Sequence, residues 1–339
     1  MASCEAQAGV GPGLRVRSGE LSILLAAVAY GLSTTLSVAA LHAVRPLDLL
    51  AVELAGAAAV LLGAALVTGR LRRRGAVRQM MLGALVPGLG YLLGDFGLDR
   101  TSASNGSLLL AAEPLLTVLL AVVALHERPE RRAVVALAFG LAGGVLVALD
   151  PGSPGQPAGT TTGNLLVLAG VAVSAVFVVA TRRYSDDDGD ALNASAWQTA
   201  GGAVTATPFV AAAWASGDSQ LTTADAAGWA ACAGVLLCGA VAGIAFNRGI
   251  GRMPAARASQ LLNLTPAIGT LSAVTLLGEH PTAPQLAGGV ALFVGLTLLL
   301  RGAPDPAPRQ PALDQAVDVP AAPAVPAAST TAATRASPV

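Results

Sequence analysis

The chain has 339 residues, of which 54% are hydrophobic and only 12% are charged. Soluble domains carry about 25% charged residues, so this composition excludes an ordinary soluble protein, and the mean hydropathy of +0.65 agrees. The formal net charge is zero, which offers no general attraction for nucleic acid, and three cysteines are too few for a disulfide framework. The open question is how many times the chain crosses a bilayer.

Apolar stretches close to the roughly 20 residues that span a bilayer follow one another along the chain. The first is longer than the apolar core of a secretory signal, about 7–15 residues, so we expect it to remain as a helix. Residues 1–19 and the Pro- and Ala-rich tail 302–339 are predicted to be disordered, and 150–162 is a predicted loop. The ten predicted spans are 20–44, 46–68, 79–98, 102–125, 131–149, 163–181, 191–214, 226–247, 255–278 and 283–300.

The placement of arginine predicts the orientation of these spans. All 20 basic residues are arginines, and with ten spans only Arg45 and Arg100 fall on one side of the membrane. Every other arginine falls on the side that holds both termini. Because cytoplasmic loops carry an excess of basic residues, we expect a multi-pass protein of the inner membrane with both termini in the cytoplasm.

Two stretches at the same place in each half of the chain resemble one another. They are "SLLLAAEPLLTVLLAVVALHE" from Ser107 and "SQLLNLTPAIGTLSAVTLLGE" from Ser259, in which Pro114 aligns with Pro266. Each half holds five spans, an odd number, so the second half enters the membrane from the opposite side. Inverted repeats of this kind are typical of secondary transporters, whose substrate site lies near the midplane between the repeats.

A helix with a central proline and a final glutamate, followed by a helix with glycine, occurs twice in ten spans. This pattern resembles the EamA-type drug/metabolite transporter family, and the resemblance covers residues 20–149 and 163–301. It implies an all-α membrane protein of ten transmembrane helices, arranged as two inverted five-helix repeats around a central cavity. It also implies export of small metabolites, amino acids or drugs, without naming a substrate.

Glu113 and Pro114 interrupt the fourth span at its centre, roughly 17 Å deep at about 1.5 Å per residue. An ionisable group there costs about 2.5–3.5 kcal/mol and normally marks a pathway. Pro114 and Pro266 each free a backbone carbonyl, which predicts a helix break in each half. We predict that Glu113 binds cargo and, by binding and releasing a proton, makes protons a candidate coupling ion. The alternative is a protonated structural acid bonded to a freed carbonyl.

Other polar side chains predict a wet interior shared by both halves. Glu53 and Asp95 are acids of the second and third spans, which contain no basic residue, so they favour cationic or zwitterionic cargo. Members of the resembled family often carry an arginine where Glu53 stands, so their charge preference does not transfer to this chain. The alternative is that Glu53 or, more readily, Asp95 reaches the membrane surface. The remaining predicted substrate contacts are Tyr30, Ser33, Thr34, Asn105, Gln260 and Asn263.

Glu127 and Glu279 end their spans, where capping or loop pairing explains them better than cargo binding. A membrane-embedded enzyme would need a nucleophile and a base, or metal ligands, gathered at one depth. No span holds such a cluster, so we predict no enzyme, no cofactor and no metal site. The sequence predicts a secondary active transporter of small molecules, with a passive channel as an alternative and a homodimer left open.

Overall fold

The computed structural model describes residues 12–125, 131–150, 160–184, 190–250, 252, 258 and 261–302, and within these residues all regular structure is helical. The helices of the first half are α1 (Pro12–Leu41), α2 (Pro46–Val67), α3 (Ala76–Gly83), the π-helix η1 (Ala84–Leu89), α4 (Gly90–Leu98), α5 (Ala103–Leu110), α6 (Glu113–Leu125) and α7 (Arg131–Ala148). Those of the second half are α8 (Thr161–Tyr184), α9 (Ala191–Ala215), α10 (Ala226–Ile250), α12 (Leu264–Leu277) and α13 (Ala283–Gly302).

These helices follow the predicted spans, and the all-helical membrane fold is confirmed. Six stretches of the described residues are long and apolar enough to cross a membrane, and α7, α12 and α13 are shorter apolar helices. The remaining long helix, α9, has a more polar sequence that includes Asn193 and Gln198. The six stretches are 18–41, 46–67, 76–98, 103–120, 161–181 and 226–250.

Two details of the first half differ from the predictions. The disorder predicted for residues 1–19 is wrong from Pro12 onward, because α1 begins there. Proline is well suited to a first helical position, where its missing N–H needs no partner. The third span is not one helix over 79–98, because Val86 has φ −139° and ψ 120° inside η1. Pro87 follows Val86, and a residue before proline is driven toward extended backbone.

The predicted breaks in the fourth and ninth spans are both present. Helix α5 ends at Leu110 and α6 begins at Glu113, and a turn at Asn263 precedes α12 in the same way. Pro114 and Pro266 therefore lie in the first turn of a new helix, where their missing N–H groups leave no helix bond unmade. Each break comes before its proline rather than at it.

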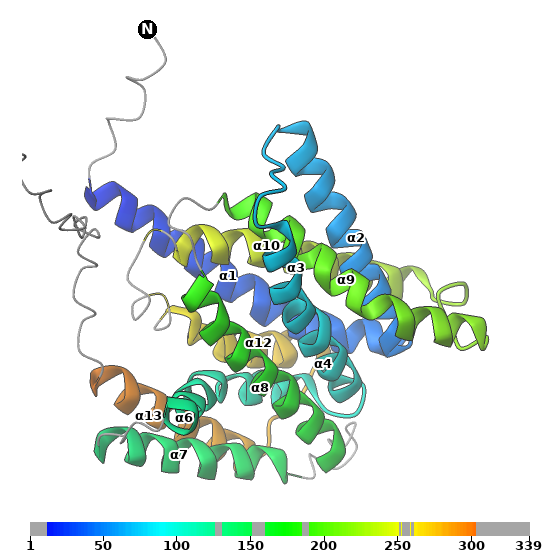
Figure 1. Cartoon of the computed structure of the whole chain (residues 1–339). Helices are drawn as coiled ribbons and strands as arrows, with labels where there is room; N and C mark the ends of the chain where they lie inside the picture. The colour runs from blue at the N-terminus through cyan, green and yellow to red at the C-terminus, as the bar shows by residue number, and fades with distance from the viewer. Residues whose placement is uncertain are drawn as a thin grey trace, which may run out of the picture. The chain divides into compact units, whose positions relative to one another are not determined.

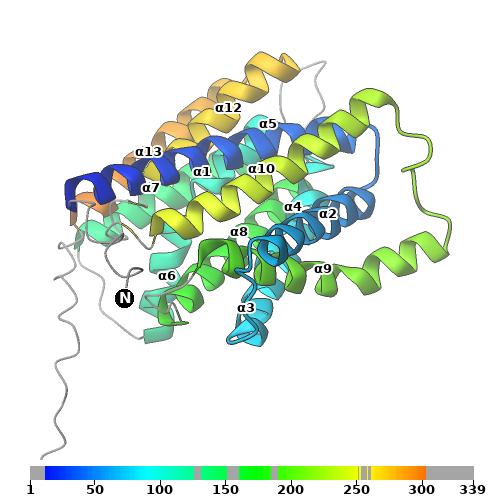
Figure 2. The ribbon, with the colours of Figure 1, turned by 90° about the horizontal axis from the view of Figure 1, so that it is seen from above.

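The two halves of the chain pack against each other along their helices. Helix α1 lies beside α10 and α12, and α7 lies beside α13 (Figures 1 and 2). At Gly143 a Cβ would lie 2.8 Å from the backbone nitrogen of Leu292, so α7 and α13 touch through their backbones. Small residues permit such close helix contacts in membranes. The largest buried cluster joins α5, α6, α7, α8 and α13 and includes Leu108, Leu109, Leu115, Val147 and Leu292.

Candidate functional site

Glu53 on α2 and Asp95 on α4 lie together inside the protein. Each is only 4% exposed, so the alternative that either acid reaches the surface is wrong. The two carboxyl groups are close enough to interact electrostatically, as expected from the packing of α2 against α4. A Cβ at Gly239 on α10 would lie 3.4 Å from Glu53 Oε1. Helix α10 of the second half thus approaches the acid pair with no side chain between.

Glu113 faces Tyr30 of α1 from the helix break. The side chain of Glu113 is half-buried, and its charge interacts with the Tyr30 hydroxyl. Glu113 is the first residue of α6, where a carboxylate is favoured by the positive end of the helix dipole. Its carbonyl oxygen accepts a hydrogen bond from the Thr117 hydroxyl at 2.9 Å. The break predicted from Pro114 therefore leaves the Glu113 carboxyl at a helix end, partly accessible.

Tyr91 on α4 is a member of this site that the sequence analysis missed. Its hydroxyl interacts electrostatically with Tyr30, Glu53, Asp95 and Glu113, so it lies near both the acid pair and Glu113. The available signal was its spacing, because residues four apart on a helix share a face and Tyr91 precedes Asp95 by four. We call Tyr30, Glu53, Tyr91, Asp95 and Glu113 the acid–tyrosine cluster.

Open space adjoins the cluster at Gly94, which lies between Tyr91 and Asp95 on α4. A Cβ built on Gly94 would have no atom within 4 Å from another part of the protein, although the glycine is only half-exposed. By contrast, a Cβ at Gly97, one turn on, would lie 2.7 Å from Val167 Cγ2 of α8. One face of α4 is thus packed, whereas the face of Gly94 leaves space for an added side-chain atom.

The apolar spans that carry the cluster hold no positive counter-charge, because Arg15 and Arg17 of α1 precede the span 20–44. None of the arginines falls inside the spans that carry these five residues, and the chain has no lysine. Three carboxyl groups and two tyrosine hydroxyls therefore share this region. Buried charges are costly unless paired, so the arrangement favours protons or a cationic group as partners.

The other predicted contacts divide between the cluster and its surroundings. Ser33 and Thr34 are half-buried on α1 close to Tyr30, and the Thr34 hydroxyl donates to the Tyr30 carbonyl at 3.3 Å. Asn263 is half-buried at the turn before α12. Gln260 lies outside the described residues. Only the two α1 residues are adjacent to the cluster.

Asn105 is used differently from its prediction as a substrate contact. It is fully buried, and its Nδ2 donates to Asn164 Oδ1 of α8 at 3.4 Å. Asn164 Oδ1 also accepts a hydrogen bond from the Thr101 hydroxyl, and Asn164 Nδ2 donates to the Ala148 carbonyl at 2.8 Å. These bonds connect α5 to α8. They lie at the same end of the helix bundle as the last residue of α1, Leu41, and we call this end the distal end. In this conformation Asn105 is a packing residue.

Glu279 closes a second contact at the distal end. Its Oε1 accepts from the backbone N–H of Ala103 and its Oε2 from that of Ser104, each at 2.8 Å. The carboxylate of the second half thus caps the first turn of α5 in the first half, as helix N-termini favour. The prediction that capping explains Glu279 is confirmed. Its counterpart Glu127 lies outside the described residues.

A third distal contact joins α2 to the end of α9. Asp48 Oδ1 accepts from Trp214 Nε1 at 2.8 Å and from the Ser219 hydroxyl at 2.9 Å, and its Oδ2 accepts from the Gln220 N–H at 2.8 Å. Arg45 pairs with Asp218 at 2.9 Å beside them, although this pair is half-exposed. Each of these three contacts joins a residue of the first half of the chain to a residue of the second half.

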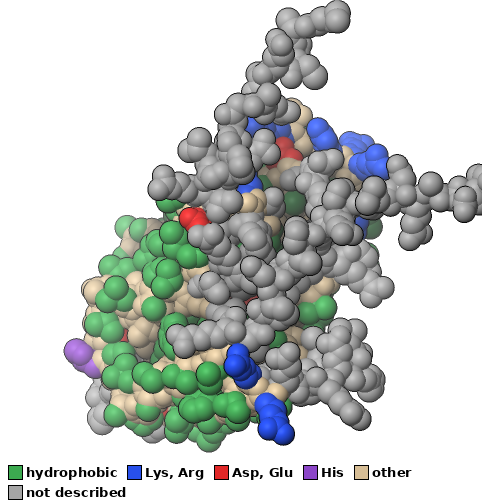
Figure 3. All heavy atoms as spheres, turned by 90° about the vertical axis from the view of Figure 1, so that its left-hand side faces the viewer, with side chains coloured by type: hydrophobic (Ala, Val, Ile, Leu, Met, Phe, Trp, Pro, Cys, Tyr) green, Lys and Arg blue, Asp and Glu red, His purple; other side chains and the backbone are tan. Residues whose placement is uncertain are grey.

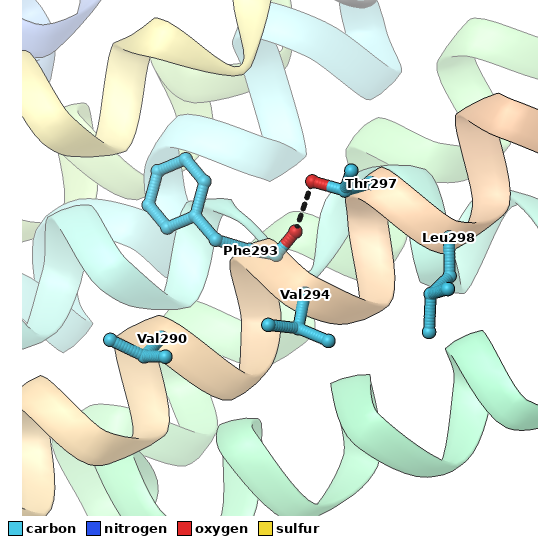
Figure 4. A pocket seen from close by; sticks show the side chains of 5 residues that line it. All are labelled: Val290, Phe293, Val294, Thr297 and Leu298. Atoms are coloured by element: carbon cyan, nitrogen blue, oxygen red, sulfur yellow. Dashed lines mark hydrogen bonds between the residues drawn. The ribbon is translucent and has the colours of Figure 1, made fainter.

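The apolar groove on α13 is a different kind of surface. Val290, Phe293, Val294, Thr297 and Leu298 line it, all from this one helix (Figure 4). The Thr297 hydroxyl donates to the Phe293 carbonyl at 2.7 Å, so it offers no free polar group. A lipid-facing helix has this character. The groove is not near any member of the acid–tyrosine cluster in sequence and shares no residue with it.

Comparison with known proteins identifies the family. The chain is 28% identical over 228 residues to the uncharacterized transporter YyaM of Bacillus subtilis (strain 168), covering 66% of this chain and 73% of that protein. It is 28% identical over 238 residues to a probable terminal-alkyne amino-acid exporter of Streptantibioticus cattleyicolor, covering 68% and 76%. A crystal structure with a TM-score of 0.54 at 20% identity covers 84% of this chain and 98% of that one, and shows a shared fold. The EamA-like transporter family matches residues 17–149 and 161–301, and the chain belongs to this family.

Proposed function

We propose that this protein exports small molecules that carry a positive charge, alone or in a zwitterion such as an amino acid, in exchange for protons. The acid–tyrosine cluster carries the proposal, because its members include three carboxyl groups and the predicted spans that hold them contain no basic residue. A carboxylate binds an ammonium group through charge-assisted hydrogen bonds, and aromatic faces attract cations. One relative is a probable amino-acid exporter, which is the same class of cargo.

The proposed location is the inner membrane, with both termini in the cytoplasm. The distribution of arginine supports this orientation. Figure 3 looks onto the side where α1 begins and α13 ends, and arginine side chains are visible on it above and below a hydrophobic surface. The distal end, with its contacts through Asp48, Asn164 and Glu279, then faces outward.

The broken spans support alternating access as the mechanism. Helix α4 packs mainly on α8, whereas α3 of the same span packs mainly on α9. Helix α5 packs mainly on α12, whereas α6 packs mainly on α8. Because the halves of a broken span have different partners, one half can move while the other stays packed. Export would require the distal contacts to open after cargo has bound from the cytoplasmic side.

In the proposed cycle cargo and proton bind in turn to the same carboxylate, that of Glu113. It is partly accessible at the helix break, whereas Glu53 and Asp95 are nearly inaccessible. An ammonium group and a proton cannot both satisfy the same carboxylate, so each would displace the other. This competition is what exchange across the membrane requires.

The test uses the full chain in proteoliposomes with an imposed pH gradient. Labelled lysine, leucine and succinate serve as cationic, zwitterionic and anionic probes. We expect uptake of lysine or leucine against their gradient, and its loss in Glu113→Gln, which keeps the size of the side chain but cannot titrate. Asp99→Asn, at the exposed end of α4, is the matched control.

Two results would contradict the proposal. If Glu113→Gln accumulates the probes like the wild-type protein at every pH, Glu113 is structural. If succinate is carried and Glu53→Gln does not reduce it, the charge preference is wrong.

A further inference from the structure

The acid pair Glu53 and Asp95 differs from Glu113 in its surroundings. Asp95 Oδ2 is buried and has no hydrogen-bond partner among the described residues, and the residue as a whole is 4% exposed. Glu53 is equally buried and its carboxyl interacts electrostatically with that of Asp95. A buried carboxylate oxygen without a donor is unfavourable, so the pair requires a hydrogen-bond donor or a cation that the described residues do not supply.

The neighbouring helices cannot neutralise two negative charges. The titratable groups that face the pair are tyrosines, thiols and another acid, none of which can be positively charged. Helices α5, η1 and α9 contain no titratable residue, and α8 has them only in its last three residues, 182–184. The arginines of α1 and α10 lie at helix ends, with Arg15 and Arg17 in the first two turns of α1 and Arg248 in the last turn of α10. The facing groups are Tyr30 of α1, Tyr91 of α4, Glu113 of α6, and Cys232 and Cys238 of α10.

Two buried carboxyl groups that interact electrostatically, as Glu53 and Asp95 do, cannot readily ionise together, so they can share one proton. We propose that Glu53 and Asp95 form a proton-binding site of their own, distinct from the cargo-binding Glu113. The pair holds one proton between its two carboxyl groups while α2, α4 and α10 are packed as they are here. The proton turns one carboxylate into a hydrogen-bond donor, which can satisfy the unpartnered oxygen of Asp95.

The pair lies where helices of the two halves meet, so binding of its proton can affect how the halves pack. Glu53 and Asp95 lie on two helices of the first half, and Gly239 of the second half approaches Glu53. Loss of the proton would leave two like charges at this junction and favour a state in which water reaches them. This role in exchange rests on the proposed transport function, whereas binding of the proton does not.

The test measures the bound proton directly and needs no cargo. The infrared carbonyl stretch of protonated carboxyl groups is recorded at neutral pH on the full chain in lipid nanodiscs, in sodium-free buffer. We expect a band in the wild-type protein that is absent from the double variant Glu53→Gln/Asp95→Asn. In Glu53→Gln and in Asp95→Asn the band should shift, because the remaining buried carboxyl binds its proton without a carboxyl partner. Glu113→Gln and the exposed control Asp99→Asn should keep the wild-type band. Circular dichroism identifies any variant that fails to fold, and the two single variants replace the double variant in that case.

Four results would overturn the proposal. The wild-type protein could lack the band, the band could be unchanged in both single variants, it could vanish in Glu113→Gln alone, or it could be lost to sodium. Loss of the band when sodium chloride is added would show that the pair binds sodium instead of a proton. Because no transport is measured, failure of the proposed export would leave this result interpretable.

Discussion

Replacing Glu279 with alanine removes the cap that the second half of the chain provides for α5. The two N–H groups that lose their acceptor belong to Ala103 and Ser104, which are 0% and 1% exposed. A hydrogen bond to a charged group contributes about 1.5–3 kcal/mol, and a buried donor left without a partner costs about 1–3 kcal/mol. Because the two bonds share one carboxylate, we expect a total loss of about 3 kcal/mol rather than the sum of the maxima.

Thermal unfolding of the purified full-length protein measures this loss. One kcal/mol shifts Tm by about 2–4 °C in chains of 150–250 residues and by less in longer chains, so in this chain of 339 residues Glu279→Ala should lower Tm by about 3–6 °C. Glu279→Gln keeps one carbonyl oxygen as an acceptor, and about half of this shift is expected. The control is Asp99→Ala, which breaks only an exposed ion pair with Arg100, worth about 0–1 kcal/mol. Unfolding of Glu279→Ala at the wild-type temperature would show that the cap does not hold the distal end.

Three further predictions concern the space beside the cluster, the distal contacts and the topology. Gly94→Leu should fold with nearly unchanged Tm but block transport, whereas Gly97→Leu should be destabilised by about 1–3 kcal/mol through overlap with α8; equal effects in both assays would remove the argument for open space. Asp48→Ala should lower Tm, because it removes three hydrogen-bond acceptor contacts, and an unchanged Tm would mean that this contact is incidental. Reporter fusions at residues 75 and 155 should report opposite sides of the membrane, and a signal from the same side would refute the inverted arrangement.

The features that local chemistry controls could be predicted from the sequence. Hydropathy identified the spans, because a bilayer requires a run of apolar residues of nearly fixed length. Pro114 and Pro266 predicted the helix breaks, because a proline cannot donate a helix hydrogen bond. The same reasoning applied to Pro87 would have found the break at η1, which was missed because the span was read only for its hydropathy.

The candidate site could not be predicted in full, because it depends on which side chains of different helices lie together, and a local sequence pattern does not contain this information. Asn105 was predicted as a substrate contact from its place in a polar span, yet it lies against Asn164 of α8. Tyr91 carried a usable signal in its spacing from Asp95, but nothing in that spacing showed that it would also approach Glu113.

By itself the sequence determined the class of protein and the presence of acids within apolar spans, and it predicted ten spans and an internal repeat. Hydropathy, proline chemistry and charge distribution act over a single span, so they can be read without knowing its neighbours. Only the tertiary structure decided that Glu53 meets Asp95 and that Glu279 caps α5. The rotation and height of each helix are set by packing against its partners, and those contacts join residues far apart in the chain.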